Sequence, residues 1–189
     1  MAFRPREVLP VLLAPLGTTM RKIIIVAPVV AGALLLLSAG PASAADTGTT
    51  FQIVGGGLAI SAPVGPVSLG TKAPTAAPET ITSPLGNVTV TDGRGGVLGW
   101  VASVASTAFT GATAVPASAI SYVPPVATVT GVALVAATPA IDLTTAKTVQ
   151  TATAVVGANS AVWNPALAVV VPAGAQAGTY NAVVTHSVI

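Results

Sequence analysis

Four side chains stand out as groups that could contact a ligand: Trp100, Trp163, Tyr180 and His186. Aromatic rings combine a large contact area with a polar atom, which suits the recognition of sugars. His186 is the only histidine of the chain, so any histidine-based catalysis would have to use it. Its neighbour Ser187 would point to the opposite face of a strand, because side chains alternate along a strand. These residues therefore indicate binding rather than catalysis.

The acidic residues do not complete a catalytic or metal-binding set. A Ser-His-Asp triad needs a carboxylate that orients the histidine, and glycoside hydrolysis needs two acids that flank the scissile bond. Residues 92–96 lack the repeated oxygen ligands of a calcium loop, so Asp92 is interpreted as a turn residue paired with Arg94. The chain also has no cysteine. The sequence therefore predicts no enzyme, no metal site and no cofactor.

The first part of the chain has the form of a secretory signal. Residues 23–39 are apolar or small, follow Arg21, and precede a small-residue cleavage sequence that ends at Ala44. A transmembrane helix is the alternative, but a span needs about 20 apolar residues, and Pro28 interrupts this one. We therefore expect residues 1–44 to be a cleaved leader, which leaves no stable membrane anchor.

The leader interpretation sets the boundaries of the working protein. Residues 1–19 carry a second apolar patch that a signal does not need, so we expect translation to start at Met20. Residues 45–189 are enough for one domain with one hydrophobic core. Their low charge and high apolar content are the opposite of the composition of disordered chains. The sequence thus predicts one ordered domain, secreted and either extracellular or associated with the cell wall.

Removal of the leader also changes the charge of the protein. Most of the basic residues lie in residues 1–44, so the basic character of the whole chain belongs to the leader. The remaining domain has a balance of −1, from three basic and four acidic residues: Lys72, Arg94 and Lys147 against Asp46, Glu79, Asp92 and Asp142. Binding to nucleic acid needs clustered Lys and Arg that displace counterions from phosphates. The scattered charges therefore exclude nucleic acid as an expected partner.

Hydrophobic alternation with a period of two predicts strands throughout residues 45–189. Val88 and Val90 alternate with threonines, and this run ends at the Asp-Gly and Gly-Gly pairs of residues 92–96, which favour a tight turn. We expect a hairpin there that leads into the strand of Trp100. β-branched content and Pro or Gly punctuation predict strands over residues 50–54, 58–62, 88–91, 99–104, 119–123, 128–135, 148–156, 166–171 and 179–188.

Eight or nine short strands joined by turns are typical of an antiparallel β-sandwich. The fold class expected here is therefore all-β, with a single antiparallel β-sandwich after the cleaved signal peptide. Residues 71–79 are rich in proline, and we interpret them as a loop or an edge segment within the same domain. No internal repeat divides the chain.

Strand alternation leaves two interpretations of the aromatic residues open. Leu98, Trp100, Ala102 and Val104 should share one face, and Tyr180 and His186 should share the inward-facing side of the last strand. In one interpretation Trp100 and His186 belong to the core. In the other, the sheet end opens into a groove that presents Trp100, Tyr180 and His186 to a glycan.

Trp163 and Tyr122 allow similar alternatives. Trp163 lies where a loop is expected to enter a strand, so it either caps the end of the sandwich or serves as an exposed platform for a ligand. Tyr122 directly precedes Val123-Pro124-Pro125, and it is expected at an edge or a corner, because proline cannot continue a sheet ladder.

Two segments of the chain have motifs with a recognisable spacing. One has NVTVTD at residues 87–92 and RGG at 94–96, followed by Gly99-Trp100; the other has VVVPAG at 169–174 and AGTY at 177–180. These segments resemble the signature strands of the WxL domain family. The resemblance implies a secreted β-rich domain of Gram-positive bacteria, here of the actinobacterial type, that attaches non-covalently to the wall through peptidoglycan. Residues 100–102 read Trp-Val-Ala and residues 186–188 read His-Ser-Val, where the family pattern has Trp-x-Leu.

Two functions are consistent with these observations. The first is a secreted surface protein that binds cell-wall peptidoglycan or wall glycan, with Trp100, Trp163, Tyr180 and His186 as its candidate ligand-binding residues. The alternative is a structural or self-associating surface protein without a wall ligand, in which uncharged, threonine-rich strand edges pair between chains. Other surface proteins are the second class of expected partner.

Overall fold

The computed structural model describes residues 47–189, so the predicted leader, its cleavage point and the proposed start at Met20 lie outside the described residues. All regular structure apart from one short 3₁₀ turn, η1 (Ala117–Ala119), is antiparallel β-structure. No helix in residues 47–189 is long and apolar enough to cross a membrane. The ten strands are β1 (Leu58–Ser61), β2 (Glu79–Pro84), β3 (Val88–Asp92), β4 (Trp100–Ser106), β5 (Ile120–Val123), β6 (Thr128–Ala137), β7 (Ala140–Ile141), β8 (Lys147–Trp163), β9 (Ala166–Val171) and β10 (Val184–Val188).

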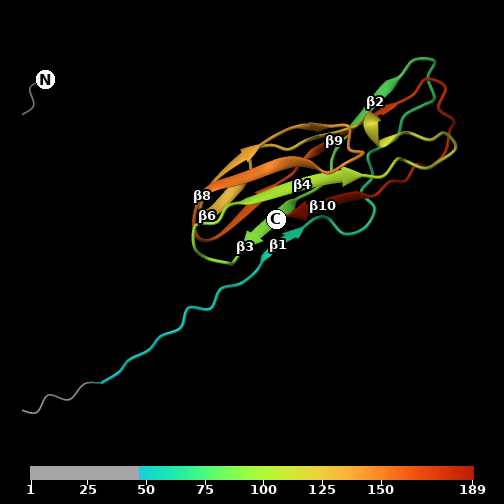
Figure 1. The fold of residues 1–189 in the computed structure, drawn as a ribbon. Coiled ribbons are helices and arrows are strands. Elements are labelled where there is room, and N and C mark those ends of the chain that lie inside the picture. Colours follow the sequence, from blue (N-terminus) through green and yellow to red (C-terminus); the bar gives the residue numbers. More distant parts are fainter. Residues whose placement is uncertain (1–46) are drawn as a thin grey trace, which may run out of the picture. The chain divides into compact units, whose positions relative to one another are not determined.

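The larger sheet is organised around the long strand β8. On one side, β8 pairs first with β4, with Trp100 opposite Ala152, and then with β3, with Val88 opposite Trp163. On its other side β8 pairs with β6. β1 pairs with β3 and β10 pairs with β4, and β1 and β10 then lie beside each other. The sheet therefore nearly closes into a barrel (Figure 1).

The second sheet has four strands in the order β2-β9-β5-β7. β9 is its centre, since it pairs with β2 along one edge and with β5 along the other. Its buried side chains, which include Ile120, Tyr122 and Leu167, join those of the larger sheet in one hydrophobic cluster. The two sheets thus share a single core.

Alternation along β3 and β4 builds much of this core. Val88 and Val90 of β3 are buried, as are Trp100, Ala102 and Val104 of β4. Gly99 makes the close approach of β4 to β8 possible, because a Cβ at this position would collide with the backbone carbonyl of Ala152.

The all-β, antiparallel class is confirmed, and so are strands at or near most of the predicted positions. The hairpin predicted between β3 and β4 is wrong. The two strands do not pair with each other, because both lie along the same side of β8. The turn at residues 92–96 does contain the expected left-handed glycines, Gly95 and Gly96. It leads the chain along β8, from Asp92 opposite Asn159 to Trp100 opposite Ala152.

Several expected elements differ in length or position. Residues 50–54 form no strand, β10 begins only at Val184, and β8 continues well beyond the predicted end at residue 156. β2 occupies residues that follow the predicted proline-rich connection. Leu98 is 66% exposed and precedes β4, so it does not share the buried face of Trp100.

Candidate functional site

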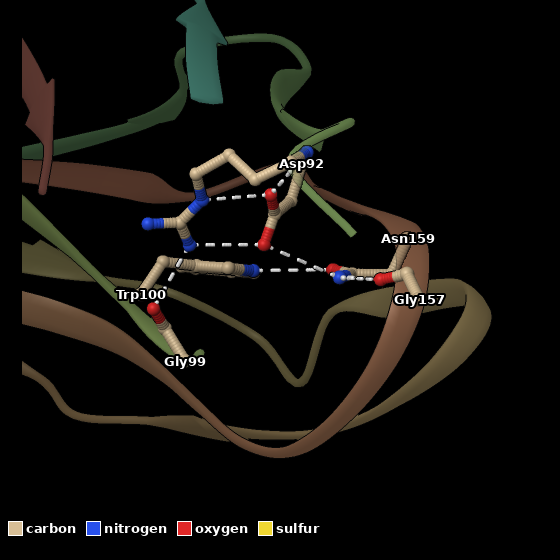
Figure 2. Close-up of polar contacts among 6 residues, drawn as sticks. Asp92, Gly99, Trp100, Gly157 and Asn159 are labelled. Carbon is tan, nitrogen blue, oxygen red and sulfur yellow. Dashed lines mark hydrogen bonds and ion pairs between the residues drawn. The ribbon is translucent and has the colours of Figure 1, made fainter. Parts of the chain in front are cut away.

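Trp100 lies in a polar cluster at the end of the larger sheet, away from solvent. Its ring is 2% exposed, and its Nε1 donates a hydrogen bond to Asn159 Oδ1 at 3.1 Å. Asn159 in turn approaches the carboxylate of Asp92 at 3.5 Å (Figure 2). The interpretation of Trp100 as a core residue is therefore confirmed, and its ring offers no surface to a ligand in this structure.

Asp92 is held in the same cluster by Arg94. The carboxylate accepts hydrogen bonds from Arg94 Nε at 2.9 Å, Nη2 at 3.0 Å and the backbone N–H at 3.1 Å. The Arg94 side chain lowers the pKa of Asp92, although burial of the carboxyl opposes this effect. Arg94 also donates to the carbonyl of Gly99 at 2.9 Å. The predicted pairing of Asp92 with Arg94 is confirmed, and it fastens the turn of residues 92–96 onto the start of β4.

A second buried chain of hydrogen bonds connects Trp163, Tyr122 and His186. Trp163 Nε1 donates to the hydroxyl of Tyr122 at 3.0 Å, and this hydroxyl lies 3.1 Å from His186 Nε2. Tyr122 is completely buried in β5, so its predicted place at an edge or corner is wrong. Trp163 is 2% exposed at the end of β8. This burial agrees with the capping interpretation rather than with an exposed platform.

The hydrogen-bond chain favours one tautomer of His186 at Nε2. The Tyr122 oxygen already accepts the Trp163 N–H, so its own hydrogen is free to be donated to His186 Nε2. Buried hydroxyl groups are almost always paired, and the described residues provide the Tyr122 hydrogen with no other acceptor. A neutral ring with Nε2 unprotonated satisfies the Tyr122 hydroxyl, but it places the ring hydrogen on Nδ1, which is buried without a partner among the described residues. Burial lowers the pKa of His186, which agrees with a neutral ring.

His186 also lines a groove beside the start of β10. The groove has a volume of about 380 Å³, within the range of small-molecule sites. Its lining combines the aromatic rings of Phe109 and Tyr180 with the imidazole of His186 and the amide of Asn181. The opposite wall comes from the loop after β1, with Pro63, Pro66 and Leu69.

A second cavity of about 610 Å³ adjoins this groove and shares Phe109, Tyr180 and Asn181 with it. It continues along residues 66–74 and residues 175–181, where Gln176 and Lys72 add polar groups to the lining. We call the two cavities together the aromatic groove. It runs between three connections that are far apart in the sequence.

The position of Tyr180 is set by contacts outside any strand. Its hydroxyl donates to the carbonyl of Gln176 at 2.6 Å, and the next residue, Asn181, exchanges two backbone hydrogen bonds with Thr110. The ring lies so close to Gly111 that a Cβ there would come within 2.7 Å of it. These contacts hold the ring of Tyr180 against the groove.

The structure thus brings two of the four predicted site residues, Tyr180 and His186, to one groove. Trp163 reaches His186 only through Tyr122, and Trp100 lies in the separate cluster with Asp92. Sequence reasoning missed Phe109, which lies in no predicted strand or motif. It also missed Asn181, because alternation placed this residue on the face of the predicted strand 179–188 opposite Tyr180 and His186. Tyr122 could have been found from alternation, since it shares a buried face with Ile120.

Within residues 47–189, no group of three or more His, Cys, Asp or Glu residues is placed to hold a metal ion. No family model, no curated protein and no solved structure matches this chain.

Proposed function

We propose that this protein is a secreted, non-enzymatic surface module that binds cell-wall peptidoglycan or wall glycan non-covalently through the aromatic groove. The observation that carries the proposal is the composition of this groove: two aromatic rings, an amide and an imidazole on one concave surface. Aromatic rings pack on the apolar faces of sugars, and the amide of Asn181 can exchange hydrogen bonds with hydroxyl groups. His186 Nε2 is paired with Tyr122 and Nδ1 is buried, so His186 offers ring surface to a ligand and not a hydrogen bond.

The predicted leader and the resemblance to WxL domains support the location part of the proposal. A cleaved signal would place the domain outside the membrane, where wall glycan is abundant. We further propose that the two sheets act as the layers of a WxL-like sandwich. Since Trp100 and Trp163 are buried, the ligand contacts are assigned to Tyr180 and His186, together with Phe109 and Asn181.

The proposal is tested by co-sedimentation of the purified protein with insoluble peptidoglycan from a Gram-positive bacterium. The wild-type protein should pellet with the wall, and Tyr180→Ala should weaken retention about tenfold, which corresponds to about 1.4 kcal/mol. Tyr180→Phe keeps the ring and should retain most of the binding. A wild-type protein that stays in the supernatant at all wall concentrations would refute the proposal.

Ile141→Ala provides the matched control. Ile141 is 75% exposed on β7 and does not line the groove. Its truncation therefore removes exposed apolar surface, as Tyr180→Ala does, but at a position outside the groove. Its binding should equal that of the wild type. Thermal unfolding of each variant shows whether lost retention reflects the groove or a loss of folding.

A further inference from the structure

The segment of residues 50–54, which we call the N-terminal arm, has the sequence of a strand but no partner. It reads Thr-Phe-Gln-Ile-Val, with β-branched and aromatic residues that favour strands. Phe51, Ile53 and Val54 are 90%, 86% and 80% exposed. Figure 1 shows this part of the chain leading to β1 with no strand beside it. Its backbone and apolar side chains are therefore available to a sheet edge.

Strand β6 has a free edge to which such a segment could pair. It pairs with β8 on one side, and no strand of residues 47–189 pairs with its other side. Its ten residues include no charged residue and no proline. Leu134 is 67% exposed and Val132 is 56% exposed. A long, uncharged and apolar edge of this type favours pairing with another chain.

The second half of β6 is its more regular part. The pairing with β8 is irregular near Gly131 and Val132, where bulges interrupt the register. Residues 134–137 then pair with β8 in four consecutive positions. This regular stretch is close in length to the N-terminal arm, and neither carries a charge.

The other free edges are protected by the devices that proteins commonly use. β2 carries Glu79 and ends at Pro84, and β7 has only two residues. β1 and β10 lie beside each other where the larger sheet nearly closes. Among the described strands, β6 is the long edge without such protection.

The arm of the same chain is poorly placed to reach β6. Gly56 N–H donates to the carbonyl of Gly93 at 2.6 Å, which anchors the arm just beyond β3. β3 and β6 lie on opposite sides of β8, so a strand added outside β6 would lie three strand spacings, about 14 Å, from β3. Five extended residues span about 17 Å, so the crossing would consume nearly the whole arm.

We propose that the N-terminal arm of one molecule adds as a strand to the β6 edge of a second copy of the same protein. Phe51 and Ile53 share one face of the arm, because side chains alternate, and this face would pack beside Leu134. Donor and acceptor are different surfaces, so the contact is head-to-tail and generates closed rings or open chains of molecules. This self-association does not depend on binding of a glycan in the aromatic groove.

Single-cysteine variants test the contact directly, because the chain has no cysteine of its own. Cysteines at residues 51, 52 and 53 are each mixed with a differently tagged Leu134→Cys or Ala136→Cys protein under a mild thiol oxidant. Paired residues on adjacent strands have Cβ atoms about 4.5–5.5 Å apart, close enough for a disulfide after small movements. We expect mixed dimers between arm and β6 in large excess over dimers of either protein with itself.

Ile141→Cys is the matched control, since Ile141 is exposed to a similar extent as Leu134 but lies in the other sheet. Equal cross-linking of the arm to residues 141 and 134 would overturn the proposal. Dominant dimers between two Leu134→Cys molecules would also overturn it, because they would show pairing of β6 with itself.

Sedimentation of the secreted protein over a range of concentrations gives the second measurement. The wild type should form species larger than a monomer, and Ile53→Pro should weaken this association at least tenfold, because proline removes a backbone donor. Leu134→Lys should have a similar effect through an edge charge. Ile53 is 86% exposed and lies outside every strand, so its variant is expected to keep the fold. A wild-type protein that stays monomeric up to millimolar concentration would refute the proposal.

Discussion

Replacement of Tyr122 by Phe should destabilise the protein by about 2–4 kcal/mol. The Tyr122 hydroxyl accepts from Trp163 Nε1 at 3.0 Å and lies 3.1 Å from His186 Nε2. Phenylalanine fills the same volume, so the change creates no cavity and removes only the hydroxyl. Each buried group left without its partner costs about 1–3 kcal/mol, and the burial of a less polar ring offsets part of this loss.

Chemical denaturation measures this prediction as a lower midpoint with an unchanged slope, since the surface exposed on unfolding stays the same. For a domain of this size, the loss corresponds to a fall of about 10 °C in the melting temperature. Tyr180→Phe is the control, because the Tyr180 hydroxyl is exposed and donates a single bond to Gln176. Tyr180→Phe should lower the free energy of unfolding by less than about 1 kcal/mol. A loss below about 0.5 kcal/mol for Tyr122→Phe would contradict the assignment of a buried hydrogen-bond chain.

Two further predictions concern pH. Burial lowers the pKa of His186 below its usual value of 6.5, so the neutral ring contributes stability that is complete above pH 6.5 and decreases as the pH falls below it. The free energy of unfolding should therefore fall as the pH is lowered from 7 to 5, and His186→Gln should flatten this dependence. If the variant shows the same dependence of unfolding free energy on pH as the wild type, the role of His186 is refuted. Arg94 lowers the pKa of Asp92, so Asp92→Asn should cost about 1.5–3 kcal/mol at pH 7. That difference should shrink as the pH falls below 3.8, whereas a constant difference would show that the charge of Asp92 does not matter.

The strands that follow simple alternation could be predicted from the sequence, and their partners could not. Val88, Val90 and Trp100 are buried as alternation predicts, because each lies on one face of a short strand against the core. The glycines of residues 92–96 predicted a reversal of the chain, whereas β3 and β4 run in the same direction along β8. This local signal does not determine that both flanking strands pair with β8, since that pairing depends on the unusual length of β8.

The aromatic groove is a second feature that could not be predicted from the sequence. Its lining comes from the loop after β1, from Phe109 and from Tyr180, which no sequence period connects. Pro124 and Pro125 suggested an edge position for Tyr122, but the strand ends just before them and leaves its ring in the core. Local signals therefore identified the extended segments and individual aromatic residues, whereas the groove depends on contacts between distant loops.

Two predicted strand segments form no strand within residues 47–189, for different reasons. Residues 179–183 are extended but turn toward the aromatic groove, where the backbone of Asn181 bonds to Thr110 and Tyr180 packs beside Gly111. These residues line the groove instead of adding a strand to a sheet. Residues 50–54 have no such contacts, although Phe51, Ile53 and Val54 are apolar. Because exposed apolar strands gain stability only when they find an edge, a second molecule is the partner that best accounts for this segment.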